Sequence, residues 1–172
     1  MIKAKQIHDI GKIKTLIDYN PDTGLLTWKV NRQGNAKAGM TAGWRHKAGY
    51  VAIRVDGHEY LGHRLAWAMH HGSIPEDMQI DHINGDRSDN RICNLRAASH
   101  AENCWNSKAR KHNKSGIKGV RKCRTKWHVR IRHNHKVYWL GSYDTAEEAK
   151  QAYDAAAIKL FGEFAENKRR PS

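Results

Sequence analysis

One amphipathic strand near the C-terminus restricts the possible folds of this chain more than any other segment. From residue 127 to residue 132 two kinds of side chain alternate strictly, as they do on the two faces of a β-strand. One face comprises Trp127, Val129 and Ile131, and the other comprises His128, Arg130 and Arg132. Because an antiparallel sheet can bury one face and leave the other accessible, the segment predicts a covered apolar face and an open cationic face. Trp127 is therefore expected in the core.

The element that covers the apolar face is predicted directly downstream. Thr145-Ala-Glu-Glu148 has the pattern of a capping box, and an apolar stripe at helical spacing follows until Gly162, where the helix is expected to end. The stripe comprises Ala146, Ala149, Ala152, Tyr153, Ala156, Ala157, Leu160 and Phe161. Flanking strands are expected at 119–123 and 137–141. The C-terminal part thus predicts a three-stranded antiparallel sheet packed on one helix, whose cationic face can enter the major groove of DNA.

The positive charge of the chain is concentrated in this C-terminal part. Residues 1–107 carry 14 Lys and Arg against 11 Asp and Glu, a net charge of +3, whereas residues 108–172 carry 17 against 6, a net charge of +11. Residues 103–143 contain no Asp or Glu, and residues 108–136 contain twelve Lys or Arg. Such a cationic field favours a polyanionic partner, and double-stranded DNA fits both the field and the sheet.

The N-terminal part predicts a mixture of short helices and strands. A β-hairpin is expected at 50–61, because two extended segments flank Asp56-Gly57, a dipeptide typical of a type I′ turn. The other expected elements are a short helix within 7–17, a strand at 25–30, a loop or irregular hairpin at 34–49, a helix at 63–71, a polar loop at 81–90, an extended segment at 94–96 and a helix at 99–107 that begins with the capping pair Ser99 and Glu102. We therefore expect an α+β protein with a first module at 1–107, a basic linker at 108–114 and a second module at 115–172.

Cysteine usage and hydropathy exclude two further classes. The three cysteines, Cys93, Cys104 and Cys123, form no C-x-x-C pair, which argues against a finger-type zinc site. The sequence has neither a signal peptide nor an apolar run of about 18 residues. We expect a cytoplasmic protein with no membrane partner.

One polar cluster contains the residue types that phosphodiester hydrolysis requires. Asp81 and His82 are adjacent, Asn94 follows His82 by twelve residues, and Asn103 lies nine residues further on. Hydrolysis needs an activated water and a cation for the developing charge. A neutral imidazole can accept a proton from water, whereas carboxylate and amide oxygens are hard ligands that favour Mg²⁺ or Mn²⁺ over zinc. On its own, an Asp-His pair in a polar loop is more commonly surface structure than a catalytic site.

The sequence around this pair resembles the phage-type variant of the HNH nuclease family. The resemblance is carried by Ile80-Asp-His-Ile-Asn-Gly-Asp-Arg-Ser-Asp-Asn-Arg91, by Asn94-Leu-Arg96, and upstream by Tyr19-Asn-Pro-Asp-Thr-Gly-Leu-Leu-Thr-Trp28 and His63-Arg-Leu-Ala-Trp67. It covers roughly residues 19 to 107. It implies a ββα-metal nuclease module in which a strand, a loop and a strand pack on a helix.

The same resemblance implies a role for each residue of the cluster. Asp81 and Asn103 would hold one Mg²⁺ (or Mn²⁺) ion per active site. His82 would be the general base, and Asn94 would brace the loop by hydrogen bonds. An Asp before the base and an Asn at the last position replace the histidines of other HNH enzymes, a departure that phage-type members share. His63 is expected near the phosphate or, as is more common for a histidine that opens a helix, as a cap or packing residue.

Residues 115–167 resemble a second family, the Apetala/ethylene-response-factor DNA-binding domain. The resemblance is carried by Gly119-Val-Arg121, Lys126-Trp127, Arg130-Ile-Arg132, Trp139-Leu-Gly-Ser-Tyr-Asp-Thr-Ala-Glu-Glu-Ala149 and Ala152-Tyr-Asp-Ala-Ala156. It implies a three-stranded sheet in the major groove, with DNA contacts from Arg121, Arg132 and Trp139. Arg130 stands where that family has an acidic residue, and Cys123 and Val137 stand where it has arginines, so base specificity cannot be transferred. Arg130 is also expected at DNA, and Lys122 and Arg124 are expected near phosphates.

Together the two resemblances indicate a homing-type endonuclease of the free-standing kind that phages carry. We expect metal-dependent cleavage of double-stranded DNA that leaves 5′-phosphate and 3′-hydroxyl ends. One site per chain predicts one nick per binding event by a monomer. Two alternatives remain open: a sequence-specific DNA-binding regulator whose nuclease module is inactive, and a defence or recombination nuclease.

Overall fold

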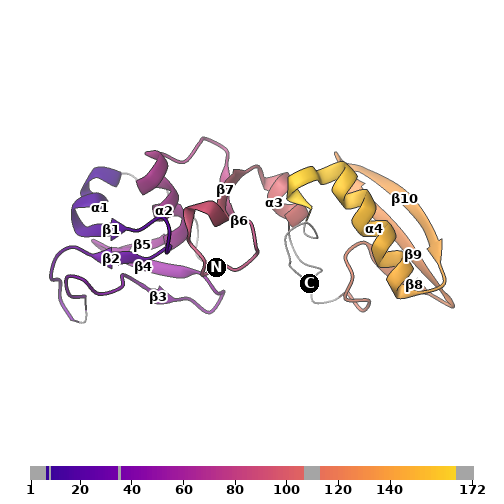
Figure 1. Ribbon diagram of the computed structural model, residues 1–172, viewed down its shortest axis with the longest axis horizontal. Coiled ribbons are helices and arrows are strands. Elements are labelled where there is room, and N and C mark those ends of the chain that lie inside the picture. The colour runs from indigo at the N-terminus through magenta and orange to yellow at the C-terminus, as the bar shows by residue number, and fades with distance from the viewer. Residues whose placement is uncertain (1–6, 8, 35, 107–112, 166–172) are drawn as a thin grey trace. The chain divides into compact units, whose positions relative to one another are not determined.

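The computed structural model describes residues 7, 9–34, 36–106 and 113–165, and the chain divides into two compact units. The first unit ends at His100 and the second begins at Ala101 (Figure 1). Both units combine helices with antiparallel strands, so the predicted α+β class is confirmed. Most of the predicted linker at 108–114 lies outside the described residues.

The first unit is built from short elements. In chain order they are α1 (Ile10–Leu16), β1 (Ile17–Tyr19), β2 (Leu26–Trp28), β3 (Trp44–Arg45), β4 (Val51–Val55), β5 (His58–Leu61), α2 (Gly62–His71), β6 (Gln79–His82), the 3₁₀ turn η1 (Ile92–Asn94) and β7 (Leu95–Ala98). The predicted hairpin is confirmed as β4 and β5, with positive φ at Asp56 (48°) and Gly57 (77°), as a type I′ turn requires. Strand β3 joins its edge, so the glycine-rich stretch forms an irregular hairpin arm.

The predicted first helix is shorter in the structure. It begins only at Ile10, after Asp9 caps it by accepting a hydrogen bond from the Lys12 amide at 2.8 Å. It ends before Ile17, which the helical spacing had included. Ile17 instead opens β1 opposite Trp28, and its side chain is fully buried there. Tertiary burial of a β-branched residue therefore overrides the helical pattern.

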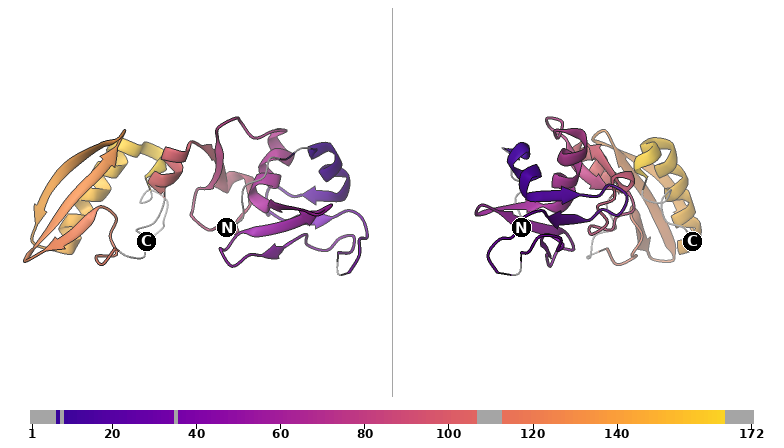
Figure 2. Two further views of the ribbon diagram at one scale, coloured as in Figure 1. Left: turned by 180° about the vertical axis from the view of Figure 1, so that it is seen from behind. Right: turned by 60° about the vertical axis from the view of Figure 1, so that its left-hand side comes forward.

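The second unit has the predicted architecture. It contains α3 (His100–Asn106, from Ala101 onward), β8 (Val120–Cys123), β9 (Lys126–His133), β10 (Lys136–Tyr143), α4 (Ala146–Phe161) and the 3₁₀ turn η2 (Gly162–Phe164). The strand order is β10-β9-β8, all antiparallel, and α4 lies along one face of this sheet (Figures 1 and 2). The capping box of Thr145 and Glu148 is confirmed. Gly119 is required by close packing, because a Cβ there would lie 2.2 Å from the Tyr153 ring.

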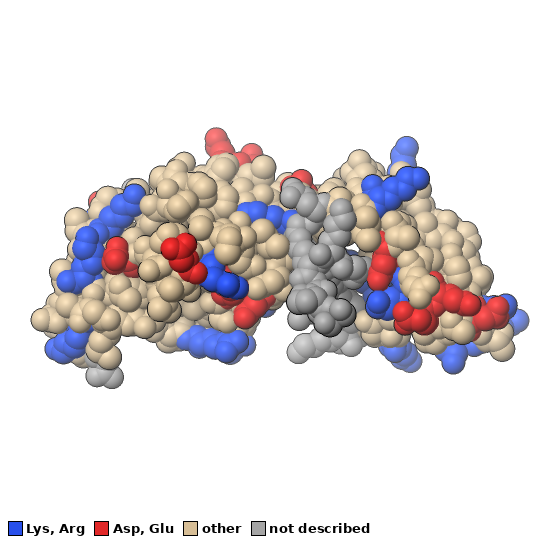
Figure 3. All heavy atoms as spheres, viewed as in Figure 1, with Lys and Arg blue, Asp and Glu red and all other residues tan. Residues whose placement is uncertain are grey.

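Charge is distributed unevenly over the two faces of the second unit. Trp127, Val129 and Ile131 face α4 in the core, as predicted. Figure 3 shows Asp and Glu side chains beside Lys and Arg over the part of this unit where α4 runs. The opposite sheet face bears arginines and no acid, since residues 103–143 contain none. In the part of the chain that the structure describes, no helix is long and apolar enough to cross a bilayer.

Candidate active site and nucleic-acid interface

Asp81 and His82 end strand β6, which corrects the prediction that they lie in a loop. Strand β6 pairs with β7, with Asp81 opposite Arg96 and His82 opposite Leu95. Ile80 and His82 are buried on one face, and the loop begins only after His82. Asp is a weak strand former, but pairing with β7 and burial against α2 decide the conformation. Both candidate residues are thus held on regular secondary structure.

Arg96 fixes the carboxylate of Asp81. Its Nη2 and Nε donate hydrogen bonds to Asp81 Oδ2 at 2.8 and 3.2 Å. The two side chains are only 10% and 11% exposed, so this cross-strand ion pair is shielded from water. The carboxylate therefore has one defined orientation. Sequence reasoning had noted Arg96 only as part of a motif.

His82 is oriented by Asn90. The ring is 4% exposed, and its Nε2 lies 3.2 Å from Asn90 Oδ1. An amide oxygen can only accept, so Nε2 carries the proton and Nδ1 keeps the lone pair. Burial lowers the pKa of His82, although the hydrogen bond to Asn90 opposes this shift. The imidazole is therefore neutral near pH 7, and Nδ1 can act as a proton acceptor.

Asn94 braces the loop that follows His82. Its Oδ1 accepts a hydrogen bond from the Asn84 amide at 2.9 Å, and its Nδ2 donates to the Asp89 carbonyl at 2.8 Å. Asn84 Nδ2 also donates to Asp89 Oδ2 at 2.9 Å. These contacts close the loop on itself beside the end of β6. Asn94 thus forms hydrogen bonds to the loop; the part that Asn94 plays in catalysis stays a prediction.

The end of β1 and the loop that leads to β2 contact the backbone around Asn90. Tyr19 Oη donates to the Asn90 carbonyl at 2.7 Å, and the Ile92 amide donates to the Pro21 carbonyl at 3.0 Å. Gly24 packs against the same backbone. The motif upstream of the catalytic segment therefore holds Asn90, and through it His82. The sequence identified the motif at residues 19–28 but did not indicate which residues it contacts.

Gly24→Ala is expected to destabilise the first unit strongly. A Cβ at Gly24 would lie 2.5 Å from the Arg91 amide nitrogen, and φ is +74°. Gly34 is a matched control, because its φ is +70° but, among the described residues beyond its chain neighbours, no atom lies within 4 Å of the added Cβ. Both alanines cost about 1–2 kcal/mol for the left-handed backbone, and only Gly24→Ala adds the clash. Urea unfolding should show the larger loss for Gly24→Ala, and equal losses would contradict this packing.

A second histidine, His63, lies beside His82 in the interior. The two ring centroids are 4.8 Å apart, and Tyr50 packs on both rings. His63 is 5% exposed, so the structure supports the packing alternative rather than a direct contact with phosphate. Among the described residues its Nδ1 has no hydrogen-bond partner. Burial, together with the nearby His82, lowers the pKa of His63 well below its usual value.

Acid should destabilise the protein through His63. The unfolded histidine binds a proton below about pH 6.5, whereas the buried one does not, so stability falls as pH drops through that value. His63→Leu should flatten the dependence of melting temperature on pH between about 5 and 7. The exposed His58 provides the control variant His58→Leu. Parallel curves for wild type and His63→Leu would contradict this assignment.

The donor chemistry at Asp81 fits a hard divalent cation. Its carboxylate is preoriented by Arg96. Within the described ranges no group of three or more His, Cys, Asp and Glu side chains could hold a metal. The predicted ligands, the Asp81 carboxylate and the Asn103 amide oxygen, are hard oxygen donors, and Mg²⁺ tolerates water at its remaining positions. Asn103 lies on α3 in the second unit, and its partnership with Asp81 stays a prediction.

The open face of the second unit carries most of the residues predicted to contact DNA. Strand register places Arg121 opposite His128, Arg130 opposite Trp139, and Arg132 opposite Val137, all on the face away from α4. Trp139 is 60% exposed, and its ring packs edge-on against His128 at 5.0 Å. Exposed Arg124 lies in the turn between β8 and β9, with φ 53°.

Lys122 lies on the other face of the sheet from Arg121. The register pairs it with Trp127, on the face toward α4, and its Nζ lies 5.4 Å from the centre of the Trp127 ring. Odd and even positions of β8 point to opposite faces, so Arg121 and Lys122 cannot share one. The predicted phosphate contact of Lys122 has no support from this geometry.

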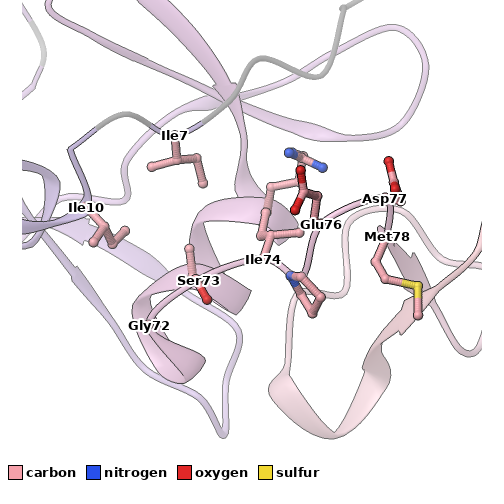
Figure 4. A pocket seen from close by; sticks show the side chains of 11 residues that line it. Ile7, Ile10, Gly72, Ser73, Ile74, Glu76, Asp77 and Met78 are labelled. Carbon is pink, nitrogen blue, oxygen red and sulfur yellow. The ribbon is translucent and has the colours of Figure 1, made fainter.

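A pocket in the first unit lies apart from these residues. It has a volume of about 350 Å³ and opens between the start of α1 and the segment after α2 (Figure 4). Its lining includes Ile7, Ile10, Arg64, Ile74 and Met78. Neither Asp81 nor His82 lines it.

Comparisons with known proteins match both halves of the chain. The family model of the HNH endonuclease matches residues 60–104, and that of the AP2 domain matches residues 115–163. An uncharacterized HNH endonuclease of Acanthamoeba polyphaga mimivirus is 32% identical over 120 residues, which are 69% of this chain and 62% of the viral protein. This chain therefore spans less than two thirds of that relative.

Two further curated relatives match shorter parts of the chain. Protein 3.8 of Escherichia phage T7 is 35% identical over 105 residues, which are 60% of this chain and 86% of the phage protein. An ethylene-responsive transcription factor of Arabidopsis thaliana is 49% identical over 51 residues, 28% of this chain and 26% of the plant protein. A solved structure titled DNA binding and cleavage by the HNH homing endonuclease I-HmuI aligns with a TM-score of 0.44 and 19% identity, over 83% of this chain and 80% of that one.

Proposed function

Because the chain belongs to the HNH endonuclease family and carries an AP2 domain, we propose that it is a homing-type endonuclease that nicks double-stranded DNA. The observation that carries the proposal is that two adjacent residues, a carboxylate and a buried imidazole, each have a partner that orients them. Asp81 is fixed by Arg96, and the adjacent His82 is fixed through Nε2 by Asn90.

In this proposal His82 Nδ1 accepts a proton from the water that attacks the scissile phosphorus. The bond from Nε2 to Asn90 keeps the ring in the tautomer that the step needs. HNH enzymes generally depend on a divalent metal. A Mg²⁺ or Mn²⁺ ion held by Asp81 and Asn103 would neutralise charge on the phosphate and the leaving 3′ oxygen. The products carry 5′-phosphate and 3′-hydroxyl ends.

One such site per chain supports a monomer that cuts one strand per binding event. The relative in phage T7 is made in a host cell, and we propose the same setting here. A plasmid assay tests the proposal. Supercoiled plasmid should become open circles with Mg²⁺ and stay supercoiled with EDTA, and DNA ligase should reseal the nicks because of their ends. Nicks that form equally in EDTA, or that ligase cannot reseal, would contradict it.

The AP2 domain supports DNA binding through the open sheet face. The alternative function, a DNA-binding regulator, would need only this face and no nuclease activity. Such a regulator would bind the plasmid without nicking it in Mg²⁺. The plasmid assay therefore separates the two functions. A defence or recombination nuclease would give the same chemistry and differ only in its target.

Arg130→Ala should weaken binding to a random-sequence duplex. Arg130 lies beside Trp139 on the open face, whereas Lys122 lies on the other face and provides the matched control Lys122→Ala. Loss of one phosphate contact should reduce the slope of log affinity against log salt concentration by about 1. Fluorescence anisotropy at several salt concentrations measures this slope. An equal change in Lys122→Ala would show that the open face is not the DNA-binding face.

A further inference from the structure

Helix α3 is too short to be stable by itself. It has seven residues, whereas an isolated helix in water needs about 12–15 to be even marginally stable. Its conformation must therefore come from tertiary packing. The contacts that provide this packing identify what holds Asn103, the residue on α3 that we propose as a metal ligand.

Trp105 anchors α3 in the core of the second unit. Its ring stacks on Phe161 at the end of α4, with centroids 4.8 Å apart and planes at 12°. It also packs on His133 at the end of β9, at 5.2 Å. Phe161 and His133 contact each other at 5.8 Å, so the three rings form a closed cluster. Aromatic clusters of this kind add stability beyond the area they bury.

Lys118 holds the end of the same helix. Its Nζ donates hydrogen bonds to the carbonyl oxygens of Cys104 and Trp105, each at 2.9 Å. Carbonyls in the last turn of a helix have no partner within the helix, and a cation there is favoured by the helix dipole. Lys118 lies two residues before the start of β8. The contacts that hold α3 thus come from α4, from β9 and from the segment just before β8.

From these contacts we infer that the AP2-type domain positions a catalytic ligand as well as binding DNA. Trp105 and Lys118 are positioning residues that hold Asn103 by holding α3, and the inference rests on the proposed function of Asn103. Strand β9 connects the two roles, because Arg130 and Arg132 lie on the open face that we propose for DNA binding, and the next residue, His133, contacts Trp105. DNA bound on this sheet therefore lies at a fixed place relative to α3.

Three full-chain variants test the inference: Trp105→Ala, Trp105→Phe and, as a control at an exposed indole of the first unit, Trp44→Ala. Hydrogen exchange without metal or DNA is the first readout. Trp105→Ala should speed exchange of the α3 amides at least about tenfold while β8–β10 stay protected. Trp105→Phe should retain most of the protection, because it keeps the stack on Phe161. Unchanged α3 exchange in Trp105→Ala would overturn the inference.

Nicking and binding provide the second readout. Trp105→Ala should lower the turnover rate with affinity for a random-sequence duplex within about twofold, and should add nothing in an Asn103→Ala background. Wild-type turnover in Trp105→Ala would overturn the inference, whereas absence of nicking by wild type would contradict only the proposed function. Trp105→Ala could also speed hydrogen exchange in β8–β10, and the variant Lys118→Met then tests the inference. Lys118→Met should speed exchange of the α3 amides alone. Protection of the α3 amides equal to wild type in Lys118→Met would overturn the inference.

Discussion

His82→Ala should lose nearly all Mg²⁺-dependent nicking, with a fall in rate of about 10²–10⁴-fold, the usual contribution of a general base. The ring of His82, the proposed general base, is buried, and its hydrogen bond to Asn90 orients it. DNA affinity should stay unchanged, because the sheet face that we propose for DNA binding belongs to the other unit. Single-turnover nicking beside an anisotropy titration measures both quantities.

His58→Ala is the matched control, since His58 is an exposed histidine of β5. It should nick like wild type. His82→Gln fills most of the same space and should be as inactive as His82→Ala, which separates loss of the base from loss of packing. Equal rates for wild type and His82→Ala would remove the catalytic assignment.

The second large effect concerns the stability of the Asp81–Arg96 pair. Arg96→Leu should lower the free energy of unfolding by about 3 kcal/mol or more, because it leaves a shielded carboxylate without its cation. The double variant Asp81→Leu/Arg96→Leu should recover most of this loss, since neither charge then remains. Urea unfolding of the two single variants, the double variant and wild type gives the coupling energy.

The more exposed pair of Arg54 and Glu59, at 3.8 Å and with side chains 65% and 28% exposed, is the control for this cycle. Arg54→Leu should change stability by less than about 1 kcal/mol. Arg96→Leu should also lose activity even where it remains folded, because Asp81 loses the contact that orients it. A loss in Arg96→Leu no larger than that in Arg54→Leu would show that the pair is not shielded in solution.

Local signals predicted the elements whose conformation is decided locally. The Asp56-Gly57 turn fixes the β4–β5 hairpin, and the Thr145–Glu148 capping box fixes the start of α4. Strict alternation from Trp127 to Ile131 was sufficient to place the core face of β9. In each case the deciding interactions lie within a few residues.

The elements that were missed depend on distant contacts. Ile17 is a strand residue because Trp28 pairs with it, and Asp81-His82 is a strand because β7 lies beside it. The support that Tyr19 gives to Asn90 joins residues 71 positions apart. No local propensity encodes such a contact. The motif signalled that these residues matter, but only the fold shows that Asn90 orients His82.

The packing of Trp105 on Phe161 also determines where a chimeric protein can join this chain to another. A chimera that exchanges the C-terminal domain at the basic stretch after residue 107 would leave the indole facing a foreign surface. A crossover between His100 and Ala101, where the compact units divide, keeps the indole with its aromatic partners. A nuclease that is retargeted by exchange of its DNA-binding domain should therefore take α3 from the same protein as the new domain.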